Sequence, residues 1–334
     1  MLKSLQILRF VAATSVVYYH ITFSFGSFGV DIFFVLSGFV IALVISKYQS
    51  PNLFAISRVS RIIPIYWILT TLLLMVILVA PNLIEETLIP SANFWNYLRS
   101  LLFIPFYNGE EVKPLLQLGW TLNYEMFFYL LVWISLILTR YSLIFVSTLL
   151  IFLFLIFAFV IQASIASSFL GNDIILEFIL GIIAFKIYSS SIMKNMSLFV
   201  LSFLIIVCFC LMIYFQINDL VTSRLFFYGL PSFLIVLCSV GLENYLTRVR
   251  TNIISFFVSM GDASYSTYLS HWYVVVASRK IFSEKLEIYN FHSSIGIFFT
   301  LIISLIVGQI IYKLADNPMN FALKKYLSNK LIKN

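Results

Sequence analysis

Charged residues are scarce in this 334-residue chain: Asp, Glu, Lys and Arg together make up 10% of it, while hydrophobic residues make up 61%. Soluble globular proteins carry about 25% charged and roughly 45–50% apolar residues. The composition therefore excludes a soluble enzyme with a single anchor and indicates an integral membrane protein. The net charge of +7 is spread among hydrophobic blocks, which argues against a disordered or nucleic-acid-binding chain.

Cysteine is almost absent. The chain has three cysteines, all inside apolar runs: Cys208, Cys210 and Cys238. Their spacing fits neither a disulfide framework nor a zinc site. We therefore expect all three to be small residues of the core.

Signals for a cleaved leader, a linker or a second domain are missing as well. Lys3 before the first apolar stretch resembles the start of a secretory signal, but Arg9 and His20 interrupt that stretch and no cleavage motif follows it. No Pro-, Ser- or Gly-rich linker divides the chain. We therefore predict a retained first span and one membrane-embedded domain over residues 1–334, with no soluble domain fused to it.

Long apolar blocks are what the sequence has in abundance. A hydrocarbon core about 30 Å thick needs about 20 apolar residues per helical crossing. Blocks of this kind lie at roughly 5–23, 29–46, 62–80, 117–138, 142–161, 173–188, 197–215, 224–240, 264–280 and 293–315. We predict an all-α, polytopic bundle of about ten transmembrane helices. The stretch 94–106 is better interpreted as an amphipathic segment at the membrane interface.

Positive charges alternate between loops as this count requires. With the N-terminus inside, most of the 21 Lys and Arg residues fall in inner segments. Because cytoplasmic loops are rich in Lys and Arg, both termini are predicted to be cytoplasmic. The long outer loop 81–116 carries four glutamates, Glu85, Glu86, Glu110 and Glu111. We expect this loop to form a lid or an acceptor-binding surface.

Ionisable side chains inside the predicted spans are candidate functional residues, because each costs at least about 2.5–3.5 kcal/mol at the centre of a helix. They are Arg9, His20, Asp31, Glu125, Glu177 and His271. Arg9 and His20 are separated by three helical turns, so they share one face about 16 Å apart along the axis. Glu177 is only four residues into its span, and we expect it at the interface.

Three of these residues, His20, Asp31 and Glu125, are predicted in the outer half of the membrane. A histidine flanked by carboxylates can take a proton from a hydroxyl group, because the carboxylates orient the ring and stabilise the imidazolium. Structural alternatives stay open. His20 would then be a hydrogen-bonded core residue, Asp31 a charge favoured by the helix dipole, and Arg9 a snorkelling side chain.

Two further groups of polar residues accompany the spans. Arg58 and Arg61 precede the third predicted span by one turn and face the same way, which suits a ligand that carries phosphate groups. Membrane topology and binding of anionic lipid are the alternative. In the ninth predicted span, Ser264, Tyr268 and His271 form a polar stripe on one face. Hydrogen bonding between helices would also explain that stripe.

Five motifs, in order along five predicted spans, resemble those of the acyltransferase 3 family of integral membrane acyltransferases. They are Arg9 and His20 in R-x(10)-H; GVDIFFVLSGF at 29–39; Arg58, Arg61, Pro64, Tyr66 and Trp67 in R-x-x-R-i-x-P-x-Y-W; Trp120, Thr121, Leu122, Glu125, Phe128 and Tyr129 in W-S-L-x-x-E-x-x-F-Y; and Ser264, Tyr265, Tyr268, Leu269 and His271 in S-Y-x-x-Y-L-x-H. The resemblance runs from Leu8 to Pro318. Thr121 departs from the usual Ser but keeps the hydroxyl, and Asp316 departs from a common Glu but keeps the charge.

The resemblance implies transfer of an acyl group, most often acetyl, from cytoplasmic acyl-coenzyme A to a hydroxyl group of a cell-surface or lipid-linked glycan. It implies that the arginines Arg9, Arg58 and Arg61 hold the donor, and that His20 acts as general base or carries the acyl group, oriented by Glu125 and Asp31. Further site candidates are Trp120, Thr121, Ser264, Tyr268, His271 and Asp316. It also implies a multi-pass protein of the bacterial cytoplasmic (inner) membrane. No metal is implied, since the histidines, His292 included, lack ligand spacing.

A transporter or export protein for a sugar, a polyol or an acylated product is the main alternative, because ten spans with buried charges are also typical of carriers. We see no inverted repeat and no paired, interrupted spans, and the arginines suited to phosphate lie only on the inner face. These features favour an enzyme. Two questions stay open: whether the acceptor is a small molecule in place of a glycan, and whether an acyl-histidine intermediate forms.

Overall fold

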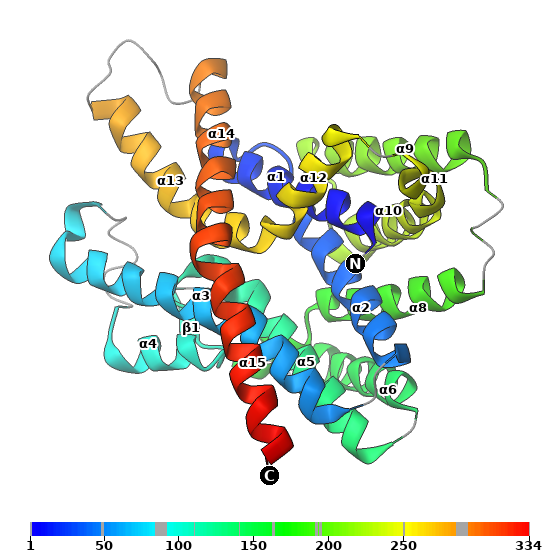
Figure 1. The fold of residues 1–334 in the computed structure, drawn as a ribbon. Helices are drawn as coiled ribbons and strands as arrows, with labels where there is room; N and C mark the ends of the chain where they lie inside the picture. Colours follow the sequence, from blue (N-terminus) through cyan, green and yellow to red (C-terminus); the bar gives the residue numbers. More distant parts are fainter. Residues whose placement is uncertain are drawn as a thin grey trace. The chain divides into compact units, whose positions relative to one another are not determined.

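The computed structural model describes residues 2–47, 50–83, 92–109, 111–139, 141–161, 164–190, 193, 196–249, 251–284 and 293–333. These residues are mostly helical (Figure 1). The described chain divides into two compact units: Met1–Lys47 with Asp173–Gln309, and Tyr48–Asn172 with Ile310–Asn334. Expectations about Glu85, Glu86, Glu110 and His292 concern residues outside the described ranges.

The first unit is a bundle of helices around α1. Its helices are α1 (Lys3–Thr22), α2 (Gly29–Lys47), α8 (Glu177–Ser189), α9 (Leu198–Ile217), α10 (Leu230–Gly241), α11 (Glu243–Arg248), α12 (Asn252–Asp262), α13 (Ser264–Glu284) and most of α14 (Ser294–Ile311). Helix α1 packs against α2, α10, α12 and α13, and α2 packs against α8 (Figure 1). The apolar core lies between α1, α2, α8, α9 and α10. Helix α1 is therefore enclosed by other helices.

The N-terminal end of α1 is capped by a distant residue. The carboxylate of Glu243 on α11 accepts hydrogen bonds from the backbone amides of Lys3 and Ser4, at 3.0 and 2.8 Å. These amides belong to the first turn of the helix, where they have no partner within it, and a negative charge there is favoured by the helix dipole. At Gly261 of α12 a Cβ atom would lie 1.9 Å from the carbonyl oxygen of Gln6. The helix that carries Arg9 and His20 is thus held firmly at its start.

Helices α2 and α8 approach each other at two glycines. A Cβ atom at Gly38 would lie 2.1 Å from the carbonyl oxygen of Phe178, and one at Gly181 would lie 2.1 Å from that of Val35. No side chain fits there unless the backbones separate. Small residues at such crossings let membrane helices pack closely.

We predict that Gly181→Val destabilises the folded protein by about 3 kcal/mol or more, because overpacking against backbone cannot be relieved by a side-chain rotation. The loss would be measured as a lower unfolding temperature of the detergent-solubilised protein. Gly109→Ala serves as a control for a glycine with open space around it, although its φ of 69° adds a small strain. An unchanged unfolding temperature of Gly181→Val would contradict the packing described.

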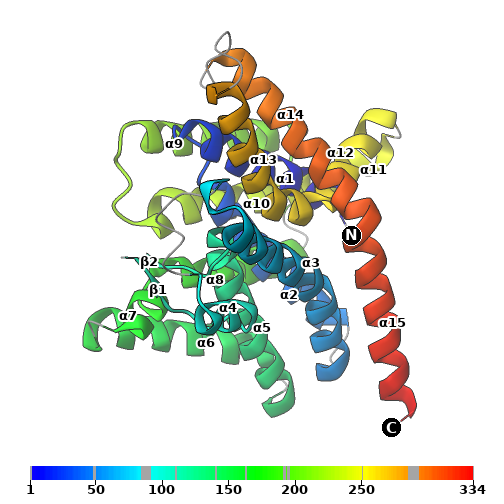
Figure 2. The same ribbon diagram turned by 90° about the vertical axis from the view of Figure 1, so that its left-hand side faces the viewer.

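The second unit is built on α3. Its helices are α3 (Pro51–Val79), α4 (Phe94–Leu101), α5 (Trp120–Leu138), α6 (Ser142–Leu155), α7 (Ile165–Leu170) and α15 (Asn317–Lys333), with the antiparallel strands β1 (Tyr107–Asn108) and β2 (Glu111–Val112). Helix α3 packs against α4, α5 and α15, and α5 packs against α6 (Figure 2). Short 3-10 or π segments are η1 (Pro81–Leu83), η3 (Gln117–Gly119), η4 (Ile156–Val160), η5 (Asp173–Leu176), η7 (Leu225–Gly229) and η8 (Tyr312–Asp316), of which η5 and η7 belong to the first unit.

The described part of the predicted outer loop 81–116 is anchored on α3 by Tyr66. The buried Tyr66 hydroxyl donates to the carbonyl oxygen of Ser100 at 3.1 Å, and the ring stacks on Phe103. The hydroxyl of Ser100 in turn accepts from the amide of Leu115 at 2.8 Å. This segment is therefore packed against the helix, and its role as a lid or acceptor surface stays a prediction.

Seven helical segments of the described chain are long and apolar enough to cross a membrane. They are Gly29–Lys47, Pro51–Val79, Gln117–Leu138, Ser142–Val160, Leu198–Ile217, Leu225–Arg248 and Ser294–Leu331. The protein is thus an all-α membrane protein, but the expected count of ten is not confirmed. The other three predicted spans correspond to α1, α8 and α13. Helix α8 has only 13 residues, and α1 and α13 carry many polar side chains that neighbouring helices enclose.

Three expectations about single elements need correction. Helix α3 begins at Pro51 with Ser50 as its N-cap, so Arg58 and Arg61 lie within the helix and not ahead of it. The residues after 315 continue as a helix to Lys333. Cys208 and Cys238 are buried as expected. Cys210 is exposed, because α9 buries only one face and Cys210 lies 200° around the helix from Cys208.

Candidate functional site

Two histidines from distant parts of the chain meet in the first unit. His20 lies in the last turn of α1 and is half-buried, and His271 on α13 is fully buried. Nε2 of His271 lies 3.2 Å from Nδ1 of His20. Each Nδ1 also faces a backbone carbonyl of its own helix, that of Val16 at 2.9 Å and that of Thr267 at 3.2 Å.

We infer the tautomer of each histidine, that is, which ring nitrogen carries the hydrogen, from these hydrogen-bond partners. A carbonyl oxygen only accepts, so both Nδ1 atoms must be N–H donors. Nε2 of the neutral His271 then accepts from the Nδ1–H of His20. In this tautomer the lone pair of His20 is on Nε2. A neutral His271 therefore orients His20 as a base and stabilises the imidazolium that forms when His20 takes a proton.

The surroundings of His271 differ from the predicted polar stripe. Ser264 and Tyr268 are buried, and so is every other residue from 263 to 271, including those on the opposite face. The first half of α13 is therefore enclosed on all sides. The ring of Tyr268 lies 6.0 Å from that of His271, so the two belong to one aromatic cluster.

In the second unit, Glu125 and Arg58 belong to one network. The Tyr129 hydroxyl donates a hydrogen bond to the carboxylate of Glu125. The guanidinium of Arg58 lies over the ring of Tyr129, with 5.6 Å between its carbon and the ring centroid, and its Nε donates to Ser57 at 3.2 Å. Glu125 was predicted in the outer half of the membrane and Arg58 at the inner entrance. The longer α3 instead brings both residues to the same level of the α3–α5 packing.

The remaining candidates lie on these same elements. Trp120 is half-buried with its ring against Tyr124, and the hydroxyl of Thr121 donates to the carbonyl oxygen of Leu118 at 3.2 Å. Asp316 is buried in η8. Arg9 on α1 and Arg61 on α3 are half-buried. The candidates therefore divide between the two units.

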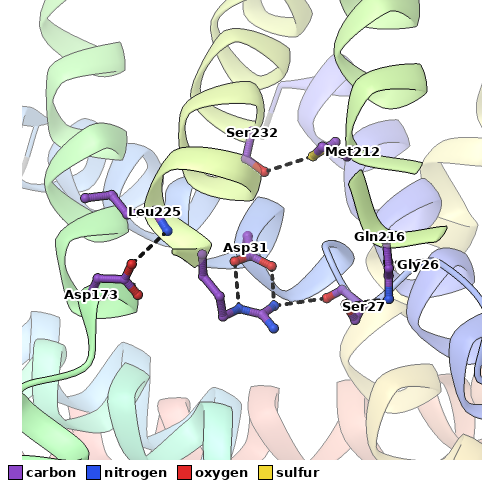
Figure 3. Close-up of polar contacts among 9 residues, drawn as sticks. Gly26, Ser27, Asp31, Asp173, Met212, Gln216, Leu225 and Ser232 are labelled. Atoms are coloured by element: carbon purple, nitrogen blue, oxygen red, sulfur yellow. Dashed lines mark hydrogen bonds and ion pairs between the residues drawn. The ribbon is translucent and has the colours of Figure 1, made fainter. Parts of the chain in front are cut away.

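Asp31 was expected to orient His20, but its carboxylate binds a different residue. Its fully buried carboxylate binds Arg224, with 3.1 Å to Nε and 2.5 Å to Nη2 (Figure 3). Asp31 lies in the first turn of α2, which agrees with the alternative of a charge favoured by the helix dipole. Sequence reasoning missed Arg224, because it stood at the start of the eighth predicted span as one of several outer-side cations.

Glu177, predicted near the membrane interface, has a side chain that is fully buried among the helices of the first unit. It is the first residue of α8, and η5 before it folds over the same core. The sequence signal was available but ambiguous: Asp31, Glu177 and Arg224 all stand near the outer ends of predicted spans. Among the described residues, no group of three or more His, Cys, Asp or Glu side chains could hold a metal ion.

Comparison with known proteins agrees with the motifs. Residues 2–313 match the family described as an acyltransferase domain. The exopolysaccharide production protein ExoZ of Rhizobium meliloti (strain 1021) is 29% identical over 266 residues, which cover 76% of this chain and 78% of that protein. No solved structure matches the chain. Since the family match covers nearly the whole sequence, this helical membrane protein belongs to the acyltransferase family that its five motifs predicted.

Proposed function

We propose that this enzyme transfers an acyl group, acetyl first among them, from a cytoplasmic coenzyme A thioester to a hydroxyl group of a cell-surface or lipid-linked polysaccharide. The hydrogen-bonded pair of His20 and His271 carries the proposal, because it supplies an oriented base inside a membrane acyltransferase. The name of the relative ExoZ supports a polysaccharide acceptor. The family's common roles support the bacterial cytoplasmic membrane as its location.

The proposed reaction breaks the thioester and forms an oxygen ester. Nε2 of His20 takes the hydroxyl proton as the acceptor oxygen attacks the thioester carbonyl. The proton then passes to the sulfur of coenzyme A, which leaves as the thiol. In the alternative route, Nε2 attacks the thioester carbonyl first and coenzyme A leaves as the thiolate. The acceptor hydroxyl then attacks the acyl-histidine, which frees Nε2, and the hydroxyl proton passes to the thiolate. Both routes need the lone pair at Nε2, and His271 positions the ring in each.

Three arginines are proposed to hold the donor. Arg58 and Arg61 are half-buried on α3, and Arg9 is half-buried on α1, three turns before His20. Guanidinium groups match phosphate oxygens through paired hydrogen bonds, so they suit the phosphates of coenzyme A. Glu125, held by Tyr129, is proposed as a second catalytic residue.

Arg9→Ala is expected to raise KM for acyl-coenzyme A about tenfold, which corresponds to roughly 1.4 kcal/mol of lost binding, and to change kcat less. Initial rates over a range of donor concentrations would measure both constants. Arg248→Ala, at an exposed position on α11, is the matched control and should change neither constant. An unchanged KM in Arg9→Ala would remove Arg9 from donor binding.

The function is tested by following the acyl group itself. Purified protein in detergent is incubated with acetyl-coenzyme A labelled in the acetyl group and with surface polysaccharides from which mild alkali has removed the esters. We expect label on one of the polysaccharides and its release by a second alkali treatment. If no glycan takes up label while folded protein moves the unmodified glycan across vesicles, the chain is a carrier and the proposal is wrong.

A further inference from the structure

A cluster of three ionisable residues lies outside the proposed catalytic group. Asp31 opens α2, Glu177 opens α8, and Arg224 directly precedes η7 and α10. The Asp31 and Glu177 side chains are fully buried, whereas the Arg224 side chain is 29% exposed. Arg224 binds Asp31 through two hydrogen bonds (Figure 3). Its guanidinium also lies over the ring of Tyr228, with 5.2 Å between its carbon and the ring centroid. The cluster thus joins three helices of the first unit.

The same arginine binds the loop that follows α1. Its Nη2, which donates to Asp31, also donates to the carbonyl oxygen of Ser27 at 3.4 Å (Figure 3). Gln216 at the end of α9 holds the loop from another side. Its Nε2 donates to the Ser27 hydroxyl and its Oε1 accepts from the Gly26 amide, both at 2.9 Å. Loop residues 23–28 are therefore tied to α2, α9 and the start of η7.

This loop packs in close contact with α1, the helix that carries His20. At Gly26, where φ is +115°, a Cβ atom would lie 2.1 Å from the carbonyl oxygen of Ser15. The amide of Phe23, in a left-handed conformation, donates to the carbonyl oxygen of Tyr19 at 2.6 Å and ends α1. The last turn of α1, with His20 in it, therefore depends on where the loop is held.

We propose that Arg224 and Asp31 are positioning residues for the reaction: their ion pair fixes the loop 23–28 against α1 and so sets the position of the His20 ring. Asp31 thus acts on His20 through the loop, where the sequence suggested direct contact. This inference rests on the proposed role of His20. The ion pair of Asp31 and Arg224, called the clamp below, lies on the side of the protein that is predicted to face the outside of the cell.

Glu177 has a different part in the cluster. Its side chain is fully buried, yet neither of its oxygens has a hydrogen-bond partner among the described residues. The groups that face it are Asp31 and Arg224, which bind each other, and Asp173, which accepts from Ser223 and Leu225. Two carboxylates buried beside one guanidinium are costly to keep charged at the same time. We therefore expect Glu177 to be a neutral acid.

The two carboxyl groups give a matched pair of variants. Asp31→Asn removes the charge that Arg224 binds, so we expect kcat to fall about 30-fold with KM for acyl-coenzyme A unchanged, a loss of roughly 2 kcal/mol. Arg224→Lys keeps the charge but loses the paired hydrogen bonds, so its kcat should lie between those of Asp31→Asn and wild type. Glu177→Gln keeps a neutral hydrogen-bonding group and should retain most of the activity. A cluster that matters only for packing would make both amide variants equally harmful.

Amide hydrogen exchange separates the clamp from the proposed reaction, because it needs no substrate. In Asp31→Asn we expect faster exchange at Gly26 and its neighbours than in wild type, and no change in Glu177→Gln. Where Asp31→Asn does not fold, Arg224→Lys is measured in its place. Unchanged exchange and unchanged kcat in the clamp variants would overturn the inference. An inactive wild-type protein with a clamp-dependent loop would instead count against the proposed function alone.

Discussion

His20→Ala is expected to lower kcat for acyl transfer by about a thousandfold, while the protein stays folded and still binds acyl-coenzyme A. A positioned general base contributes about 10²–10⁴ in rate. In the direct route the variant has no group to take the hydroxyl proton, and in the covalent route it has no nucleophile. The measurement is the rate of labelled ester formed under saturating donor and acceptor.

A substitution of His271, the hydrogen-bond partner of His20, should have a smaller effect than His20→Ala. In His271→Gln a side-chain oxygen can still accept from Nδ1–H of His20, so we expect only about a tenfold loss, less than a positioned base contributes. The unfolding temperature and donor binding of both variants should match those of wild type. If His20→Ala transfers acyl groups at a rate near that of wild type, the mechanism proposed for His20 is wrong.

Glu125→Gln is expected to have the second largest effect, a fall in kcat of about 10²-fold. The carboxylate lies inside a predicted span and is held by the hydroxyl of Tyr129, so its position does not depend on the substrate. As a proposed second catalytic residue it supplies a negative charge, and an uncharged amide cannot replace that charge.

Two controls accompany Glu125→Gln. Glu111→Gln removes an exposed carboxylate on β2 that pairs with Lys113, and it should leave kcat unchanged. Tyr129→Phe keeps the charge of Glu125 but removes the hydroxyl that holds it, so its effect should be smaller. Equal kcat values for Glu125→Gln and wild type would show that Glu125 has no part in the reaction.

Local patterns predicted much of the fold. The blocks 29–46 and 117–138 agree with the helical segments Gly29–Lys47 and Gln117–Leu138 to within a residue. Their apolar runs are interrupted at both ends by turn residues, so sequence alone marks their limits. The start of α3 was missed because Arg58 and Arg61 look like the end of an apolar block. In the structure, the helix starts at Pro51 with Ser50 as its cap, about three turns before the predicted start at residue 62.

Partnerships between distant residues could not be predicted in the same way. His20 and His271 are separated by 251 positions, and Asp31 and Arg224 by 193. Each was visible as a polar residue in or beside an apolar block, but spacing along one helix carries no information about which other helix it meets. The same limit applies to the burial of Glu177, because a position near the end of a span does not show which helix packs over it.

The most direct test of the account measures coenzyme A released from acetyl-coenzyme A by purified wild-type protein and by His20→Ala, with and without a panel of surface glycans. The proposed mechanism predicts that the wild-type protein releases coenzyme A only when an acceptor glycan is present, and that His20→Ala releases almost none. Release that needs neither acceptor nor His20 would contradict it, as would no release by folded wild-type protein with any glycan of the panel.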